Sequence, residues 1–151
     1  MVCYRDIPFS EVSIIKEVWE RNRKFHEEIS KSFKYLYSDI VFEDRINVFS
    51  SFDKEHIKIT LAEDEESFRL LGYCISTFEG NQGEPQTLHV VEEARGTGIG
   101  KELMNRHIEW LKNNGCEDIN ITVSYDNNNT IKFYESMGFK PNTMEMKLKS
   151  N

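Results

Sequence analysis

Apolar residues in the first third of the chain recur with the period of a helix. A short apolar opening around residues 2–4 predicts a strand, after which Ser10 can cap a helix. A second helical stretch is expected after Asp39. At roughly i, i+3, i+4 spacing, the apolar stripes of the two helices consist of Ile15, Val18, Trp19, Phe25 and Ile29, and of Phe42, Ile46 and Phe49.

The middle of the chain changes to the alternating period of a strand. Ile57, Ile59 and Leu61 alternate with polar residues, and a second apolar segment at 68–78 follows the acidic turn at 63–67. The two segments predict an antiparallel hairpin. Residues 81–86 then interrupt the pattern, and a third strand is expected over about 86–91.

From Gly98 the apolar residues return to helical spacing. Ile99, Leu103, Trp110 and Leu111 predict a helix that stops at Gly115. Three further elements complete the pattern. They are a strand with Ile119, Ile121 and Val123, a short helix from about Asn129 to Met137 closed by Gly138, and a last strand with Met144, Met146 and Leu148.

These elements follow the order β-α-α-β-β-β-α-β-α-β. That order predicts an α/β (α+β) fold in which helices flank a mixed, mostly antiparallel central sheet. A chain of 151 residues has the length of one domain. Because no repeat, low-complexity tract or linker interrupts it, we expect a single domain over 1–151.

Charge and cysteine content narrow the classes of partner. Nineteen basic against twenty-six acidic residues give a net charge of −7, whereas nonspecific nucleic-acid binding requires neutralising phosphates. Nucleic acid is therefore not an expected partner. No apolar stretch has the length of a signal peptide or a membrane span, so a cytoplasmic protein without a membrane partner is expected. Cys3, Cys74 and Cys116 form no pattern typical of disulfides or of a metal site.

Gly96, Gly98 and Gly100 stand at every second position where the third expected strand leads into a helix. Glycine destabilises a helix or strand interior by about 0.5–1 kcal/mol relative to alanine, so this spacing indicates a backbone that closely approaches a ligand. A strand, a glycine turn and a helix N-terminus together form an anion site. We therefore expect a phosphate-binding loop here, with a tight turn that binds nothing as the alternative.

Two familiar phosphate loops fit this segment poorly. The Walker A pattern fails because Glu102 follows Gly100-Lys101 and Arg95 stands where its first glycine belongs. The Rossmann pattern requires G-x-G-x-x-G, and the acidic pair at 117–118 precedes the next strand instead of ending it. A Rossmann-type dinucleotide-binding protein is kept only as an alternative.

A third loop matches better. The segment RGTGIG resembles the R/Q-x-x-G-x-G/A signature of the GNAT superfamily of acyl-CoA N-acyltransferases, through Arg95, Gly98 and Gly100, although Glu92 replaces a proline common in that family. The later segment NNNTIKFYESMGF resembles the family motif N-x-x-A-x-x-F-Y-x-x-x-G-F, with Thr130 where alanine is common. Its matching residues are Asn127, Phe133, Tyr134, Gly138 and Phe139.

The resemblance implies an N-acetyltransferase that uses acetyl-CoA and transfers the acetyl group directly to a primary amine. It implies that backbone groups of Leu88 and Val90 hold the pantetheine arm and that Asn127 contacts the same arm. Tyr134 occupies the general-acid position, with a packed core tyrosine as the alternative. The residues expected at the coenzyme A pyrophosphate are Arg95, Gly96, Thr97, Gly98, Ile99, Gly100 and Lys101.

A base must also take a proton from the amine, because at a lysine-like pKa of about 10.4 only about one amine in a few thousand is neutral at pH 7. A continuous strand would place Glu84 on the same face as Gln86, Leu88 and Val90, which makes Glu84 the candidate base. His89 falls on the opposite face from Leu88 and has a pKa nearer neutrality. Glu84, His89 and water all remain open as the base.

No motif marks the acceptor, which we expect to be a small-molecule or peptide amine. The N-terminal helices offer aromatic and acidic groups that suit a cation, although these groups equally fit a core edge and a solvent face. These residues are Phe25, Glu28, Phe33, Tyr35 and Tyr37. A noncatalytic module that binds coenzyme A is the rival class, and a homodimer is among the open oligomeric states.

Overall fold

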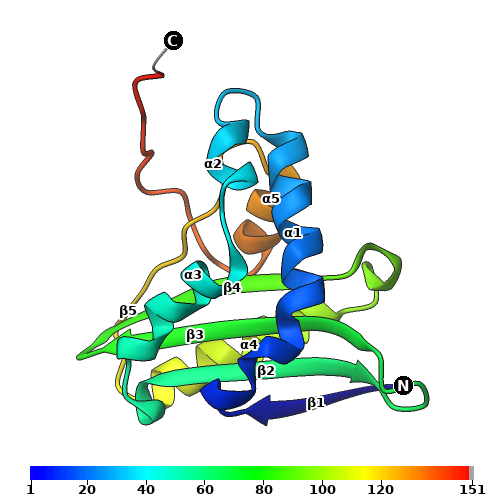
Figure 1. The fold of residues 1–151 in the computed structure, drawn as a ribbon. Coiled ribbons are helices and arrows are strands. Elements are labelled where there is room, and N and C mark those ends of the chain that lie inside the picture. Colours follow the sequence, from blue (N-terminus) through cyan, green and yellow to red (C-terminus); the bar gives the residue numbers. More distant parts are fainter. Residues whose placement is uncertain (150–151) are drawn as a thin grey trace.

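The computed structural model describes residues 1–149 and contains a five-stranded sheet in the order β1-β2-β3-β4-β5 (Figure 1). Strands β1 to β4 pair with one another in antiparallel order, and β5 runs parallel to β4. The expected α/β class with a mostly antiparallel sheet is therefore confirmed. The strands are β1 (Val2–Ile7), β2 (Ile57–Asp64), β3 (Leu70–Glu79), β4 (Gln82–Val90) and β5 (Asp118–Ile119).

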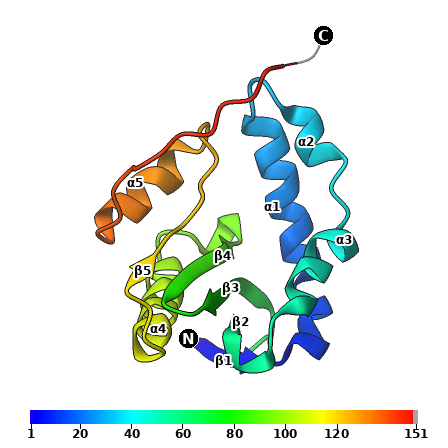
Figure 2. The ribbon, with the colours of Figure 1, turned by 90° about the vertical axis from the view of Figure 1, so that its left-hand side faces the viewer.

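Helices cover both faces of the sheet. Figure 2 shows α1, α2 and α3 on one side and α4 and α5 on the other. The α-helices are α1 (Lys16–Ile29), α2 (Lys34–Ser38), α3 (Phe42–Asn47), α4 (Ile99–Asn113) and α5 (Asn128–Ser136). Short 3-10 turns at Phe9–Ile15, Val48–Ser51, Lys54–His56 and Glu92–Ala94 connect the longer elements.

The core lies between the sheet and the helices on either face. On the α1 side, Trp19 packs edge-on against Phe42 at 5.3 Å between ring centroids. On the other side, Leu103, Met104 and Leu111 of α4 are wholly buried. The apolar stripes that predicted these helices are thus the faces that they bury.

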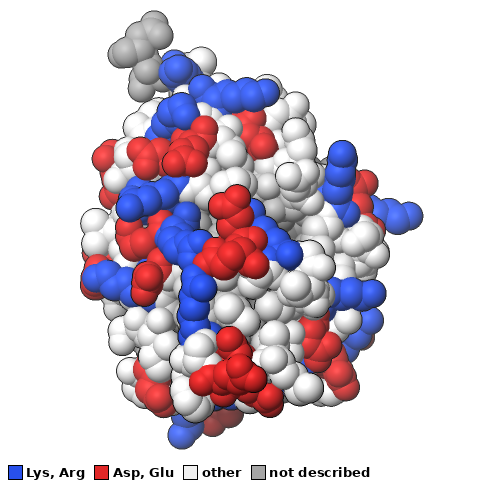
Figure 3. All heavy atoms as spheres, turned by 90° about the vertical axis from the view of Figure 1, so that its right-hand side faces the viewer, with Lys and Arg blue, Asp and Glu red and all other residues white. Residues whose placement is uncertain are grey.

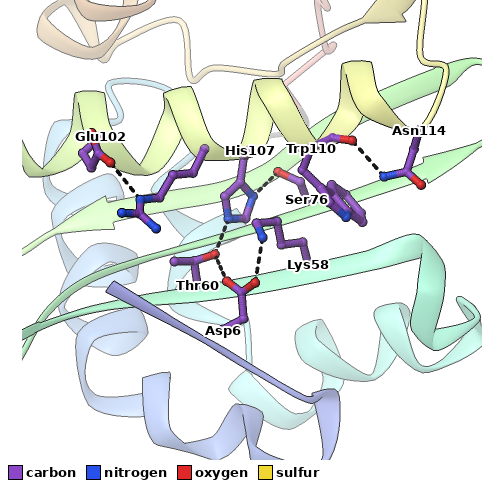
Figure 4. Close-up of polar contacts among 9 residues, drawn as sticks. Asp6, Lys58, Thr60, Ser76, Glu102, His107, Trp110 and Asn114 are labelled. Atoms are coloured by element: carbon purple, nitrogen blue, oxygen red, sulfur yellow. Dashed lines mark hydrogen bonds and ion pairs between the residues drawn. The ribbon is translucent and has the colours of Figure 1, made fainter. Parts of the chain in front are cut away.

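A chain of hydrogen bonds also joins α4 to the sheet (Figure 4). His107 lies 2.7 Å from the Ser76 hydroxyl through Nδ1 and 2.8 Å from the Thr60 hydroxyl through Nε2. Thr60 donates to Asp6 at 2.6 Å, and Lys58 pairs with the same carboxylate at 2.7 Å. Because Thr60 donates to Asp6, it accepts from Nε2–H of His107, and Nδ1 of His107 accepts from Ser76. The buried polar groups of this chain, those of His107, Ser76 and Thr60, therefore all have partners.

Two predicted helix boundaries differ from the structure. Ser10 caps no helix, because Pro8 precedes a 3-10 turn and α1 begins only at Lys16. Tertiary packing favours the turn here, since Val12 and Ile15 within it are buried. The short helix α2 was not predicted, and its residues include none that is buried.

The predicted last strand is absent from the part of the chain described, since residues 139–149 follow α5 without joining the sheet (Figure 1). Met144, Met146 and Leu148 are exposed instead, Leu148 by 99%. The segment expected to contain Ile119, Ile121 and Val123 forms a strand only at Asp118–Ile119. Because β5 leaves the sheet after two residues, it offers no extended edge against which a further strand could pair.

Candidate active site

Strands β4 and β5 separate soon after they meet. They pair only at Gln82 with Asp118 and Gly83 with Ile119, followed by one hydrogen bond from Asn120 N–H to the Gly83 carbonyl at 3.0 Å. Beyond that point the outer edge of β4 has no partner strand within residues 1–149. Val91 N–H still donates to Leu71 of β3, so by alternation the backbone groups of Val90 and Leu88 point away from β3, towards this open edge.

The separation opens a cleft of about 630 Å³ between α1, β4, the glycine loop and α5. Ten of the twelve predicted site residues line it, and they come from four different elements. These are Leu88, Val90, Arg95, Gly96, Gly98, Ile99, Gly100, Lys101, Asn127 and Tyr134. Thr97 and Glu84 do not line the cleft.

The glycines of the loop differ in what their positions require. Gly96 and Gly98 have φ values of 79° and 88°, a left-handed conformation that favours glycine, and a Cβ on either would meet no atom within 4 Å. Gly100 has ordinary helical geometry, and a Cβ there would make ordinary contacts at 3.6 Å with Phe133 and 3.7 Å with Val90. Gly98 is the N-cap of α4, so the free N–H groups of the first turn lie beside the cleft and can bind an anion.

Arg95 extends from this loop across the mouth of the cleft. Its Nε donates to the Val90 carbonyl at 3.2 Å, and its guanidinium lies 5.4 Å from the ring centroid of Phe25 on α1. Thr97 turns inward instead and donates to the Ala94 carbonyl at 2.6 Å. Thr97 therefore stabilises the loop, whereas the Arg95 side chain is available to a ligand.

The loop is tied to distant parts of the chain by ion pairs. Glu93 pairs with Arg21 of α1 at 2.7 Å and also with Arg69, which follows the β2–β3 turn. Acidic and basic side chains are interleaved on the face that Figure 3 shows. That face therefore has no continuous basic surface of the kind that binds nucleic acid.

Tyr134 lies on α5 with its ring against Phe133 and Phe139. Its residue is only 9% exposed, and burial raises the pKa of its hydroxyl, so Tyr134 is protonated at neutral pH. Asn127 is the N-cap of α5, and its side-chain oxygen accepts from Thr130 N–H at 3.4 Å. Asn127 therefore caps α5 through its side-chain oxygen, and its amide nitrogen remains free to contact a ligand.

The prediction that Glu84 shares a face with Leu88 and Val90 is wrong. The register of β4 against β3 shifts by one residue at Gln86, so that Thr87 lies opposite Ile75 but Pro85 lies opposite Ser76. This bulge reverses the alternation and puts Glu84 on the face of Thr87 and His89. The Glu84 carboxylate accepts from Gln86 Nε2 at 2.7 Å.

Two histidines contribute to the cleft from its α1 side. His89 points to the opposite face of β4 from Leu88, as expected, and is buried. Burial is the largest cause that lowers the pKa of His89 to about 3, and Arg95, His26 and Arg21 lower it further. His26 of α1 was not predicted, yet its Nδ1 is the one buried side-chain nitrogen or oxygen without a hydrogen-bond partner among residues 1–149.

The predicted acceptor-binding residues are mostly outside the cleft. Phe25 lines it, while Tyr37 lies behind and stacks on His26 at 5.5 Å. Glu28 is exposed, and Phe33 packs against the exposed Tyr35. Sequence reasoning missed His26 and Asn22, although both share a helical face with Phe25. Spacing alone did not show which part of that face meets the cleft.

Metal-ligand clusters and membrane-spanning helices are both lacking in residues 1–149. No group of three or more His, Cys, Asp or Glu side chains there could hold a metal ion. Across the same residues, no helix combines the length and the apolar character needed to cross a membrane. All three cysteines are free, and only Cys3 is exposed.

Comparisons with known proteins agree with this geometry. The chain is 36% identical over 78 residues to the uncharacterized N-acetyltransferase YobR of Bacillus subtilis, which covers 52% of this chain and 31% of the relative. The chain thus spans about a third of that relative's length. A single-residue mutant of the BH1408 protein from Bacillus halodurans superposes with a TM-score of 0.75 at 16% identity, covering 97% of this chain and 98% of the other.

The aminoglycoside N-acetyltransferase AAC(6')-Iy in complex with CoA has the same fold. Its TM-score is 0.69 at 12% identity, covering 99% of both chains. Residues 19–139 match the family model described as the acetyltransferase (GNAT) family. This match confirms the resemblance read from the glycine loop and the Tyr134 motif. The chain therefore belongs to the GNAT family, the N-acetyltransferases that take their acetyl group from acetyl-CoA.

Proposed function

We propose that this protein transfers the acetyl group of acetyl-CoA directly to a primary amine of a small molecule or peptide, with Tyr134 as the general acid. The observation that supports this most strongly is the cleft itself. It brings the glycine loop, the open edge of β4 and the Tyr134 side chain together. We propose that these parts belong to one N-acetyltransferase domain.

The residues of the cleft fit coenzyme A. The N–H groups at the start of α4, together with Arg95 and Lys101, suit the negative charge of a pyrophosphate. The outward-facing backbone groups of Leu88 and the N–H of Val90, whose carbonyl accepts from Arg95, suit the amide-rich pantetheine arm, which can hydrogen-bond to the β4 edge as an added strand would. Gly100 leaves the space beside Phe133 and Val90 that a side chain would fill.

Acetyl-CoA supplies a thioester, and transfer joins the amine nitrogen to the acetyl carbon, breaks the carbon–sulfur bond, removes a proton from nitrogen and protonates sulfur. Tyr134 acts on the sulfur side. Because burial raises its pKa, Tyr134 still carries its proton at neutral pH, donates a hydrogen bond to the sulfur, and passes the proton to it as the carbon–sulfur bond breaks. Its position in the buried wall of the cleft limits competition from water.

Fewer groups can accept the proton of the amine nitrogen than the sequence suggested. Glu84 does not line the cleft and reaches it only through Gln86, which lines the cleft and holds the carboxylate. His89 lines the cleft directly and is neutral. We therefore propose that a neutral group or water accepts this proton, with Glu84 in a supporting position.

Calorimetry with acetyl-CoA, followed by a panel of amines assayed for thiol release, tests this function. We expect micromolar-range binding of acetyl-CoA, no comparable binding of NADH, and thiol release with at least one amine. Acetyl-CoA binding with no release across polyamines, aminoglycosides, amino acids and peptides would instead indicate a noncatalytic module. Preference for NADH would contradict the proposal altogether.

A further inference from the structure

We propose that the amine acceptor is a weakly basic amine of the α-amino type, bound in its neutral form, and that His26 Nδ1 accepts a hydrogen bond from it. This inference rests on the proposed function and narrows the acceptor to one chemical class. Three features of the cleft support it: an unpartnered imidazole nitrogen, the absence of carboxylates from the lining, and the charge around the two histidines.

The first feature is His26 itself. Its ring lies between two aromatic neighbours, with Tyr37 stacked at 5.5 Å and Phe25 edge-on at 5.6 Å. The ring lines the cleft, but no group among residues 1–149 bonds to its buried Nδ1. A buried polar atom without a partner typically destabilises a protein by about 1–3 kcal/mol. Rotation of the ring about the Cβ–Cγ bond would turn Nδ1 towards the cleft, where a ligand N–H would remove this penalty.

The second feature is the lack of negative charge. None of the residues that line the cleft is an aspartate or glutamate, whereas Arg95 and Lys101 are both among them. Several carboxylates around the cleft are engaged elsewhere, since Glu93 pairs with Arg21 and Arg69, Glu84 accepts from Gln86, and Asp126 accepts from Lys31 N–H. An ammonium group that entered the cleft would lose its hydration without gaining a counter-charge.

The third feature is the set of groups around His26. His89 of β4 lies near it, Tyr37 of α2 stacks on it, and Arg95 of the glycine loop lies over the adjacent Phe25. Arg23 on its own helix pairs with Glu20 and Glu27 and donates to the Tyr37 carbonyl. Burial lowers the pKa of His26, and it lowers that of His89 together with Arg95. Surroundings that disfavour a protonated imidazole equally disfavour an ammonium ion.

Basicity then separates the possible acceptors. At pH 7 an α-amino group with a pKa of about 7.7–8.0 is neutral in roughly one molecule in ten, but a lysine-like amine with a pKa of about 10.4 in only one of a few thousand. A cleft that binds only the neutral form therefore favours the α-amino group by about a hundredfold or more at the same intrinsic affinity. Polyamines and lysine side chains are the disfavoured acceptors.

A pair of matched peptides tests the substrate class on the unmodified protein. One peptide has a free α-amino terminus and no lysine, and the other has the same sequence with an acetylated terminus and one lysine. With acetyl-CoA at saturation, we expect kcat/KM for the first to exceed that for the second by about a hundredfold at pH 7, with the ratio shrinking towards pH 10. Equal rates, or faster transfer to the lysine peptide or to spermidine, would overturn the inference and leave the proposed function standing. Transfer to no amine at all would contradict both.

Substitutions of His26 test its role. His26→Phe keeps a ring to stack on Tyr37 but removes Nδ1, and we expect KM for the α-amino peptide to rise about 3- to 10-fold with unchanged acetyl-CoA affinity. His26→Asn, whose amide oxygen can occupy the position of Nδ1, should restore part of the loss. His56→Phe is the matched control, because His56 packs on Phe78 outside the cleft. An unchanged KM in His26→Phe, with acetyl-CoA binding intact, would remove His26 from acceptor binding.

Discussion

Each face of the sheet has a histidine with a buried ring nitrogen, and the two histidines, His107 and His26, differ in how those nitrogens are bonded. On the α4 face, both ring nitrogens of His107 have hydroxyl partners, and a continuous chain leads from Ser76 to Lys58. On the α1 face, His26 lines the cleft with Nδ1 unpartnered. A satisfied polar group stabilises the fold, whereas an unsatisfied one beside a cleft points to a ligand. Substitutions can therefore test which polar groups stabilise the fold and which belong to the cleft.

Tyr134→Phe should give the largest effect, because Tyr134 belongs to the cleft but also packs in the core. Loss of the hydroxyl should lower kcat by about 10²–10⁴-fold, with little change in acetyl-CoA affinity or unfolding temperature, since the ring contacts remain. Steady-state kinetics and calorimetry measure this. Tyr125→Phe, at a residue 71% exposed, is the matched control. A Tyr134→Phe enzyme with normal kcat would assign the tyrosine to packing alone.

Acid should destabilise the fold through His107, whose two ring nitrogens are both hydrogen-bonded. The folded-state pKa of His107 is lowered to about 3, by burial first and by Lys58 next, with Asp6 acting in the opposite direction. Below a pKa of about 6.5 the unfolded chain binds a proton that folded His107 does not, so stability is complete above pH 6.5 and falls as pH drops towards 3.

Urea unfolding at steps between pH 7 and pH 4 measures this loss, which we expect to approach about 1.4 kcal/mol per pH unit for each such histidine. His107→Gln should lower the slope of unfolding free energy against pH by the contribution of one histidine, about 1.4 kcal/mol per pH unit. His89 contributes in the same direction, since its pKa is also about 3, so the slope in His107→Gln should remain above zero. A slope unaffected by His107→Gln would show that this buried chain does not control acid stability.

Gly100→Ala should reduce acetyl-CoA affinity by about tenfold while leaving the fold intact. The added methyl group would stand in ordinary contact with Phe133 and Val90 without backbone strain, but it would occupy space beside the open edge of β4. Calorimetry and thermal unfolding separate the two effects. Gly80→Ala is the control for backbone strain alone, because Gly80 has a φ of 58° in the β3–β4 turn. Full affinity in Gly100→Ala would place coenzyme A elsewhere.

Glu84→Gln should have the smallest effect, a decrease in kcat/KM of only a few-fold near neutral pH. The carboxylate lies outside the cleft and acts only through Gln86, so it positions other groups instead of contacting the reacting atoms. Glu79→Gln, at the exposed end of β3, is the matched control. A loss of a hundredfold or more that high pH restores would reinstate Glu84 as the base.

The sequence predicted the cofactor side of the cleft better than the acceptor side. Gly98 and Gly100 are marked by their spacing, and Tyr134 by the family motif F-Y-x-x-x-G-F around it, because both signals lie within short segments of the sequence. The face of Glu84 depends on a bulge at Gln86, and the exposure of His26 to the cleft depends on how α1 packs. These are tertiary features without a local signal. Met144 and Leu148 alternate as a strand does, yet they lack a sheet edge with which to pair.

The bulge at Gln86 divides β4 into two segments whose side chains are out of phase. Because of the extra residue, Pro85 faces α4 and Glu84 faces α1, while Leu88 and His89 keep the same two orientations in reverse order along the chain. Removing Gln86 would leave Thr87 opposite Ile75 and Pro85 opposite Ser76, so the other side chains of β4 would keep their faces and the strand would lose only its bend. A residue inserted beside the bulge would instead send the side chains on one side of the insertion to the opposite face of the sheet. At this position the strand should therefore tolerate the loss of one residue far better than the gain of one.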